Sequence, residues 1–271
     1  MKKFLAAAAI AAGLISAAPA MAVTNGSPDG TAHPFVANLL FRTATGLWSC
    51  TGTLMSPTVV LTAGHCTEEA GAANLNTWVT FEPVINIPPS GCQGDMKCFV
   101  RYMDRLAGWT KGTAHPHPNY DDFNQWPATY DIGVIVLDKP VTKPTYGRLP
   151  PLGFLETIRP KTNSFTVVGY GQQGEIPAFY SNIWERYVGT VQLVELESTY
   201  NAGMTAKFTS NAGIGGGTCF GDSGGPIFHA NTNVVASVVS WGITPCIGVS
   251  YEFRTDTPLA QDFLRGFGIT P

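Results

Sequence analysis

Residues 221–226 read Gly-Asp-Ser-Gly-Gly-Pro and enclose a single serine, Ser223, between small residues. One interpretation is a simple glycine-rich turn, in which glycine supplies backbone angles that other residues avoid and the serine only caps a backbone amide. The same glycines also suit a reactive serine, because Gly221 lets the backbone present its N–H beside that of Ser223. Two such donors stabilise a tetrahedral oxyanion by about 3 to 4 kcal/mol each. The segment is therefore a candidate nucleophile with an oxyanion hole formed by Gly221 and Ser223.

A serine hydroxyl becomes a good nucleophile only when an imidazole takes its proton and an acid orients that imidazole. Residues 62–66 read Thr-Ala-Gly-His-Cys, and residues 130–134 read Tyr-Asp-Ile-Gly-Val. We expect His65 to be the general base and Asp131 to orient it, since the apolar run after Asp131 can carry its carboxylate into the interior, where it needs a partner. The alternatives are a structural histidine beside a disulfide and an aspartate in a surface turn.

These three segments together resemble the chymotrypsin-like serine peptidases. The chain order His, Asp, Ser is that of chymotrypsin and differs from the orders in subtilisin and the α/β-hydrolases. Further segments resemble the family's amino-terminal segment, the start of its first strand, the opening of its second lobe and the edge that pairs with substrate; in chain order they are Val23-Thr24-Asn25-Gly26, His33-Pro34-Phe35, Val168-Gly169-Tyr170-Gly171 and Ser240-Trp241-Gly242. The resemblance covers nearly all of the chain after residue 22 and points to a secreted, bacterial-type member.

The resemblance implies a serine endopeptidase that hydrolyses peptide bonds through an acyl-enzyme intermediate, with His65, Asp131 and Ser223 as its catalytic triad and no cofactor. The alternative is a catalytically silent relative that binds a partner on the same surface; such relatives commonly lose a triad residue, whereas all three are present here. An esterase would share the acyl chemistry, but residues 240–242 resemble an edge to which a peptide adds as a strand. Proteins and peptides are the expected substrates, with protein inhibitors as further partners.

The composition is typical of an all-β protein. The 271 residues include 30 glycines and 20 prolines, only 13% are charged, and short apolar runs alternate with turn residues. The expected strands are Phe35 to Phe41, Val59 to Thr62, Ile132 to Leu137, Phe165 to Val168, Tyr187 to Leu196 and Val234 to Val239. For the strand from Tyr187, alternation does not decide which face is buried.

The resemblance implies two six-stranded antiparallel Greek-key β-barrels, at about residues 36–140 and 160–257, with the active site between them. The proline-rich stretch from Pro140 to Pro160 would cross from one barrel to the other. Only the last segment, about 258–267, has apolar residues at helical spacing, so it is the one helix that we expect.

Residues 1–22 have the pattern of a secretory signal peptide: a basic start, an apolar middle and a small-residue end. The apolar part is shorter than the roughly 20 residues that span a bilayer, so no membrane anchor is expected. Cleavage near Ala22/Val23 would export residues 23–271 as a peptidase domain, to the periplasm or the medium, and we expect a monomer. The net charge is −3 with no basic cluster, which argues against a nucleic-acid partner.

In the family, a new amino terminus inserts into the body and pairs with the aspartate before the catalytic serine, here Asp222. Val23 resembles the inserted residue, and the expected cleavage falls directly before it. Export itself would then produce the active enzyme.

The six cysteines are expected to form disulfides, because an exported chain meets an oxidising environment. Spacing alone leaves fifteen pairings open. The resemblance implies Cys50 with Cys66 beside the histidine and Cys219 with Cys246 between two walls of the specificity pocket, and Cys92 then pairs with Cys98. No histidine and cysteine cluster has zinc-ligand spacing, so no metal is expected.

The interval between His65 and Asp131 is longer than in compact family members, and we place an insertion between Thr80 and Lys111. The insertion is either a surface decoration or a loop that contacts substrate or regulates the enzyme.

The resemblance places the specificity pocket at Gly217, Thr218, Phe220, Ser240, Trp241, Gly242 and Gly248. Gly217 stands where trypsin-like members carry an acidic residue. A Lys or Arg side chain would lack its counter-charge there, and an unpaired buried ammonium is costly. We therefore expect a large apolar side chain, such as Phe, Tyr or Leu, before the cleaved bond.

Overall fold

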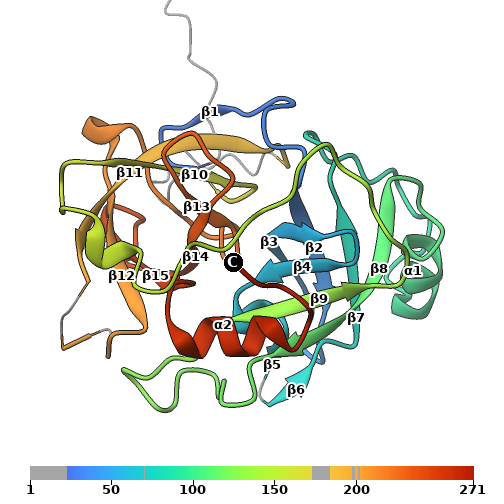
Figure 1. Ribbon diagram of the computed structural model, residues 1–271. Coiled ribbons are helices and arrows are strands. Elements are labelled where there is room, and N and C mark those ends of the chain that lie inside the picture. Colours follow the sequence, from blue (N-terminus) through green and yellow to red (C-terminus); the bar gives the residue numbers. More distant parts are fainter. Residues whose placement is uncertain (1–22, 70, 173–183, 197–198, 201) are drawn as a thin grey trace, which may run out of the picture.

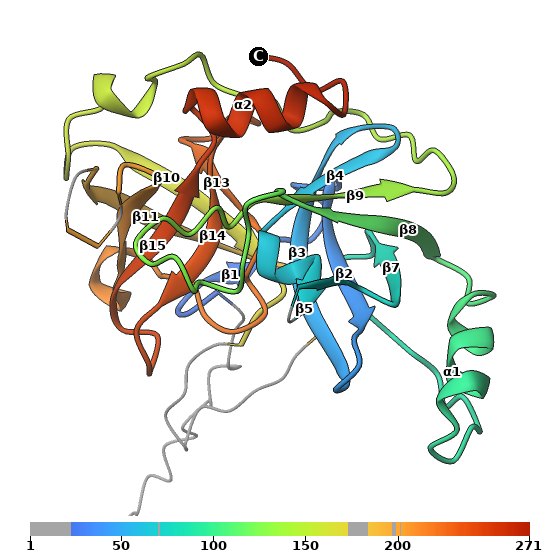
Figure 2. The same ribbon diagram turned by 90° about the horizontal axis from the view of Figure 1, so that it is seen from below.

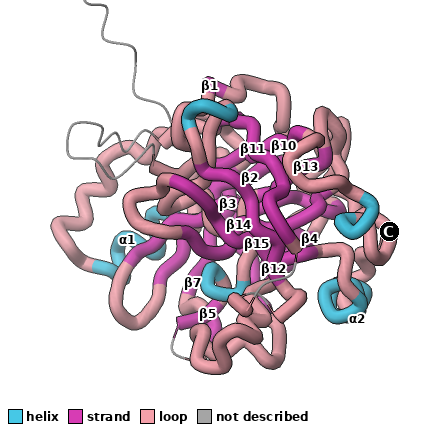
Figure 3. Tube along the Cα trace, turned by 90° about the vertical axis from the view of Figure 1, so that its left-hand side faces the viewer, coloured by secondary structure: helices cyan, strands magenta, loops and turns pink. Residues whose placement is uncertain are grey.

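The computed structural model describes residues 23–69, 71–172, 184–196, 199–200 and 202–271, so the signal peptide expected at residues 1–22 lies outside the described residues. The chain folds into two β-barrels that stand side by side, the first from the amino-terminal half and the second from the carboxyl-terminal half (Figure 1). Strands form the centre of the molecule and loops surround them (Figure 3).

The first barrel closes in the order β2-β3-β4-β9-β8-β7, with every pair antiparallel. Its strands are β2 (Val36–Arg42), β3 (Leu47–Ser56), β4 (Val59–Thr62), β7 (Asn76–Thr80), β8 (Trp109–Pro116) and β9 (Gly133–Leu137). The barrel is closed because β2 pairs with both β3 and β7. The short strands β5 (Glu68–Glu69) and β6 (Ala72–Ala73) form a separate hairpin just after His65.

The second barrel closes through the pairing of β11 with β12, in the order β11-β10-β13-β14-β15-β12. Its strands are β10 (Ser164–Gly169), β11 (Tyr187–Glu195), β12 (Thr205–Ser210), β13 (Pro226–His229), β14 (Val235–Gly242) and β15 (Gly248–Arg254), and β1 (Ser27–Pro28) adds to β11. Along β11, Tyr187, Gly189, Val191 and Leu193 are buried, so alternation does hold and these residues form the inward face.

The expected fold is confirmed: two six-stranded antiparallel barrels are followed by a carboxyl-terminal helix, α2 (Pro258–Arg265). The Thr257 side chain accepts a hydrogen bond from the Ala260 N–H, and Pro258 occupies the first turn, where its missing N–H does no harm. Leu264 is buried in the core, so the helix covers the barrels with its apolar side. No helix in the described part of the chain is both long and apolar enough to cross a membrane.

The expectation of a single helix is wrong. A second one, α1 (Met96–Met103), lies in the insertion and projects from the edge of the first barrel that faces away from the second (Figures 1 and 2). Asp95 starts it by accepting hydrogen bonds from the N–H groups of Lys97 and Cys98. Only three single-turn 3₁₀ segments accompany these helices in the described chain: Gly64–Cys66, Leu155–Thr157 and Ala212–Ile214.

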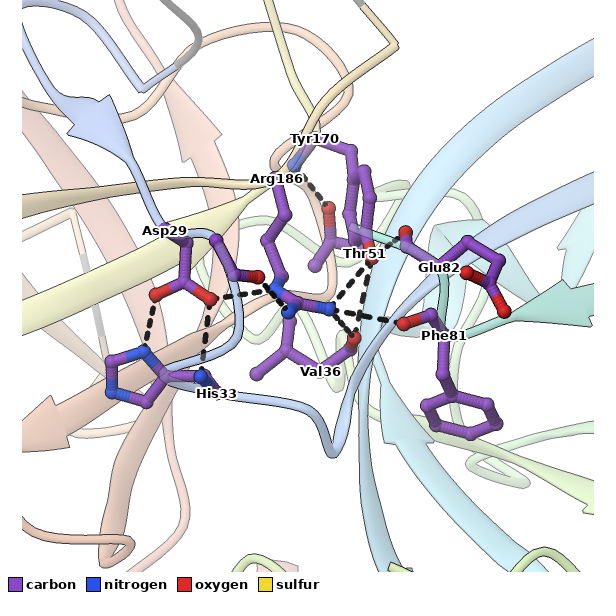
Figure 4. Close-up of polar contacts among 9 residues, drawn as sticks. Asp29, His33, Val36, Thr51, Phe81, Glu82, Tyr170 and Arg186 are labelled. Carbon is purple, nitrogen blue, oxygen red and sulfur yellow. Dashed lines mark hydrogen bonds and ion pairs between the residues drawn. The ribbon is translucent and has the colours of Figure 1, made fainter. Parts of the chain in front are cut away.

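The buried guanidinium of Arg186 ties the amino-terminal segment to both barrels (Figure 4). Its Nε donates to Asp29 Oδ2 over 2.7 Å, and its Nη1 donates to the carbonyl oxygens of Val36 and Phe81 and to the Tyr170 hydroxyl. Asp29 precedes the first barrel in the chain, whereas Arg186 directly precedes β11. The pair therefore holds in place the segment that follows residue 23.

Candidate active site

Strand register brings His65 and Asp131 together. In the antiparallel pair β4 and β9, Thr62 lies opposite Gly133. β4 ends at Thr62 and β9 begins at Gly133, so both residues lie at the same end of the strand pair. His65 follows β4 and Asp131 precedes β9, and the two therefore lie close together at that end. Gly64 is required here, because a Cβ at this position would lie 2.8 Å from the Tyr120 ring and 3.1 Å from Asp131 Oδ1.

The Asp131 carboxylate is fully buried and binds His65 twice. It accepts the His65 backbone N–H over 2.8 Å at Oδ1, and Nδ1 of the ring lies 3.1 and 3.0 Å from its two oxygens. Burial lowers the pKa of His65, but the charge and hydrogen bond of Asp131 outweigh it and hold that pKa above the usual 6.5. The same pairing holds the Asp131 pKa below its usual value despite the burial that raises it.

Each barrel also contacts the site residues that the other barrel carries. Ser240, on β14 of the second barrel, donates from Oγ to Asp131 Oδ2 over 2.5 Å. Thr51, on β3 of the first barrel, donates its backbone N–H to the Ser223 carbonyl and its hydroxyl to the Gly221 carbonyl, both over 2.8 Å. Sequence reasoning missed Thr51, because a threonine in a β-strand carries no signal of a contact with a turn far along the chain.

Ser223 lines the same cleft as His65 and is half-buried. In the described part of the chain, its hydroxyl forms no hydrogen bond with His65. The N–H groups of Gly221 and Ser223 likewise donate to no acceptor among the described residues, so both are free to bind an oxyanion.

The turn that carries Ser223 is shaped by glycines. Gly224 has a φ of +79°, and a Cβ there would meet Thr62 Oγ1 at 2.0 Å. The Asp222 side chain packs against Gly169 and Gly171, where a Cβ would lie 2.1 Å from Asp222 Oδ1 and 2.5 Å from its backbone N, respectively. This close packing is the physical reason for the Gly-Tyr-Gly segment.

Asp222 is fully buried, and its carboxylate accepts the N–H groups of Gly171 and Cys219. Burial raises its pKa to about 7, and no ion pair compensates it within the described residues. Val23 is also fully buried and packs in the core of the second barrel.

The predicted pocket residues Thr218, Phe220, Ser240, Trp241 and Gly242 line the cleft together with His65, Ser223 and Gly221. Two other predicted positions, Gly217 and Gly248, are not part of its lining. Gly217 packs against β12, where a Cβ would meet Ser210 Oγ at 2.0 Å.

The disulfides are Cys50–Cys66, Cys219–Cys246 and Cys92–Cys98. The family resemblance implied the first two, and the third is the pair that these two leave over. Ligand atoms of Cys50, His65 and Cys66 lie within 4.8 Å of one another, the one such group among the described residues. Because both sulfurs are in a disulfide, they offer no thiolate to a metal ion.

The family model for trypsin matches residues 23–264. The chain belongs to the trypsin family of serine peptidases. Trypsin-family relatives include the trypsin-like protease of Streptomyces glaucescens, 27% identical over 257 residues that cover 89% of this chain and 83% of the relative. Chymotrypsin-like elastase family member 1 of Rattus norvegicus is 27% identical over 198 residues, which cover 71% of this chain and 67% of the relative.

Solved structures agree on the trypsin-family fold. HL collagenase superposes with a TM-score of 0.69 at 18% identity, covering 92% of this chain and 100% of that one. GrC superposes with a TM-score of 0.62 at 18% identity, covering 90% of this chain and 97% of that one. Identities this low show the fold alone. Disulfide-bonded members of the trypsin family are typically secreted.

Proposed function

We propose that this trypsin-family chain is an active, secreted, bacterial-type serine endopeptidase in which Ser223, His65 and Asp131 form the catalytic triad. The observation that carries the proposal is the Asp131 carboxylate, buried and bonded to the His65 ring at 3.0 Å in the cleft that Ser223 lines. A silent relative would have no need of a buried carboxylate at this place, because taking a charge out of water is costly even when it is paired.

The arrangement supports acyl transfer in two steps. His65 takes the proton from the Ser223 hydroxyl as the oxygen attacks the peptide carbonyl, and then gives it to the leaving amine. Water next attacks the acyl-enzyme, and His65 again accepts and returns the proton. Asp131 holds the His65 ring in position and stabilises its charged form during both steps.

The N–H groups of Gly221 and Ser223 form the proposed oxyanion hole. Each would donate to the negative oxygen of the tetrahedral intermediate, at about 3 to 4 kcal/mol per donor. Thr51 supports this role because it binds the carbonyl groups of the same two residues from the other barrel.

We propose a large apolar residue, such as Phe, Tyr or Leu, at P1, the substrate residue before the cleaved bond. Gly217 offers no carboxylate to a Lys or Arg side chain at P1, and the close packing of Ser210 leaves no room for a side chain at this position. Trp48, Phe220 and Ile243 line the cleft and leave about half of their side chains exposed, which suits apolar ligands. Hydrolysis of a panel of chromogenic peptides tests the proposal, and efficient cleavage after Arg would contradict it.

We further propose that cleavage after Ala22 frees the Val23 amino group, which then pairs with Asp222. The buried Asp222 carboxylate, whose pKa burial raises to about 7, is the kind of group that a positive charge would stabilise. Edman sequencing of the secreted protein should begin at Val23. A different terminus, or full activity with one extra residue before Val23, would exclude this mechanism.

The decisive test of the function is covalent labelling with a serine-directed fluorophosphonate, with the adduct located by mass spectrometry. We expect one adduct, at Ser223, and none in Ser223→Ala. Ser164→Ala removes an exposed serine on β10 and is the matched control that should label like the wild type. Folded protein that begins at Val23 yet does not label would instead favour the binding-module alternative.

A further inference from the structure

Glu252 is a carboxyl group buried directly behind the cleft. It lies on β15 and has no exposed surface. Its Oε2 accepts the Ser240 N–H over 2.9 Å, and the Thr218 hydroxyl lies 3.4 Å from its Oε1. Ser240 and Thr218 both line the cleft beside Ser223, whereas Glu252 does not. A substrate can therefore meet Glu252 only through the groups that cover it.

No cation neutralises Glu252 among the described residues. Its partners across the sheet are Ala206 on β12 and Val239 on β14, neither of which titrates. Arg254, two residues further along β15, is engaged by Asp256 and Glu156. Burial raises the pKa of Glu252 to about 7, and the charge of Asp222 acts in the same direction.

The protonation state of Glu252 decides what Thr218 offers to the cleft. An ionised carboxylate only accepts, so the Thr218 hydroxyl donates its hydrogen bond to Glu252 and keeps its oxygen lone pairs for a donor in the cleft. A protonated carboxyl can instead donate to Thr218, whose own proton is then free to point elsewhere. The hydroxyl therefore becomes a fixed acceptor only when Glu252 is ionised.

We propose that Glu252, acting through the Thr218 hydroxyl, makes the enzyme favour a P1 side chain that ends in a hydrogen-bond donor, so that tyrosine is preferred over phenylalanine. The inference rests on the proposed peptidase function and refines its apolar P1 preference. Glu252 is then a positioning residue for specificity and does not touch the substrate.

The test compares kcat/KM for two peptides that are identical except for Tyr or Phe at P1, measured from pH 5.5 to 8.5. Titration of His65 affects both peptides alike, so it cancels in the ratio, whereas the charge of Asp222 enters the ratio only by shifting the Glu252 pKa. We expect the Tyr/Phe ratio to rise about 2- to 10-fold as the pH increases through the Glu252 pKa, the range that one neutral hydrogen bond provides.

Two variants separate this role from a structural one. In Glu252→Gln, the amide can donate to Thr218 at every pH, so the ratio should stay at its low-pH value. In Thr218→Val, which leaves Glu252 in place, the ratio should fall and lose its pH dependence. Fluorophosphonate labelling measures the fraction of folded active sites in each variant. If Glu252→Gln does not fold, Thr218→Val alone provides the test.

If both peptides are cleaved, a Tyr/Phe ratio that does not change with pH in the wild type and is the same in Thr218→Val would overturn the proposal. Failure of the wild type to label at Ser223 would instead refute the peptidase function itself. Labelling at Ser223 without cleavage of either peptide would refute the apolar P1 preference and leave the peptidase function standing.

Discussion

The charge state of His65 illustrates how single residues control this site. His65 must be neutral to act as the proposed general base, and the Asp131 carboxylate favours the charged imidazolium. The pKa of His65 is raised above 6.5, so activity should develop only as the pH increases through that higher value. The same shift adds folding stability that is fully present below pH 6.5 and is lost as the pH rises through the folded-state pKa.

At this scale we predict that Asp131→Asn lowers kcat by about 10⁴-fold, because an amide neither holds the imidazole tautomer nor stabilises its charge. It should also move the acidic limb of the kcat/KM profile to lower pH, since the carboxylate that raises the His65 pKa is gone. Steady-state kinetics from pH 5 to 9 measures both effects.

The matched control is Asp122→Asn, which removes an exposed carboxylate that also raises the His65 pKa, but only through its charge. Its effect on the limb should be smaller and should fade at high salt. An unmoved limb in Asp131→Asn would show that Asp131 does not set the His65 pKa.

At the scale of elements, the three disulfides brace very different parts of the fold. Cys92–Cys98 closes a separation of 6 residues within the insertion that carries α1. Cys219–Cys246 closes a separation of 27 residues and joins two segments that line the cleft. A longer loop restricts the unfolded chain more, so the second disulfide should stabilise the fold more.

We predict that Cys92→Ser with Cys98→Ser lowers the free energy of unfolding by at most about 2 kcal/mol and leaves kcat/KM unchanged. Cys219→Ser with Cys246→Ser should lower it by about 3 to 4 kcal/mol and impair catalysis as well. Urea unfolding and peptide hydrolysis provide the comparison. Loss of activity in the first double variant would mean that the insertion takes part in substrate binding.

At the scale of the whole molecule, contacts between the two barrels hold them in a fixed relative position. Thr51 and Ser240 reach across between the barrels, and the buried Arg186 binds Asp29 and the first-barrel carbonyls (Figure 4). Burial raises the Asp29 pKa, yet hydrogen bonds and charge from His33 and Arg186 hold it below 3.8. Its contribution to stability is therefore present above pH 3.8 and is lost as the pH falls through the lower folded-state value.

We predict that Arg186→Met destabilises the fold by about 3 to 5 kcal/mol, because it leaves the Asp29 carboxylate buried without its cation. Adding Asp29→Asn should recover part of that loss, since the unpaired charge disappears. The free energies of unfolding in urea at pH 7, measured for the wild type, both single variants and the double variant, form a double-mutant cycle. Additive effects of the two substitutions would show that the pair is not coupled.

The sequence by itself determined the fold class, the chain order of His65, Asp131 and Ser223, and the carboxyl-terminal helix. Each of these has a local signature: short apolar runs between turn residues, compact motifs around the reactive side chains, and apolar residues at helical spacing after Pro258. The disulfide pairs followed from the family resemblance, since spacing alone left them open.

Only the tertiary structure decided the contacts of Thr51, Arg186 and Glu252, the second helix, and the packing that excludes a side chain at Gly217. These depend on neighbours that lie far apart in the sequence. The Glu252 carboxyl lies behind the cleft because β15 pairs between β12 and β14, and no periodicity within residues 248–254 records which strands flank them. Local patterns report which face of an element is apolar, whereas partners across barrels are chosen by three-dimensional packing.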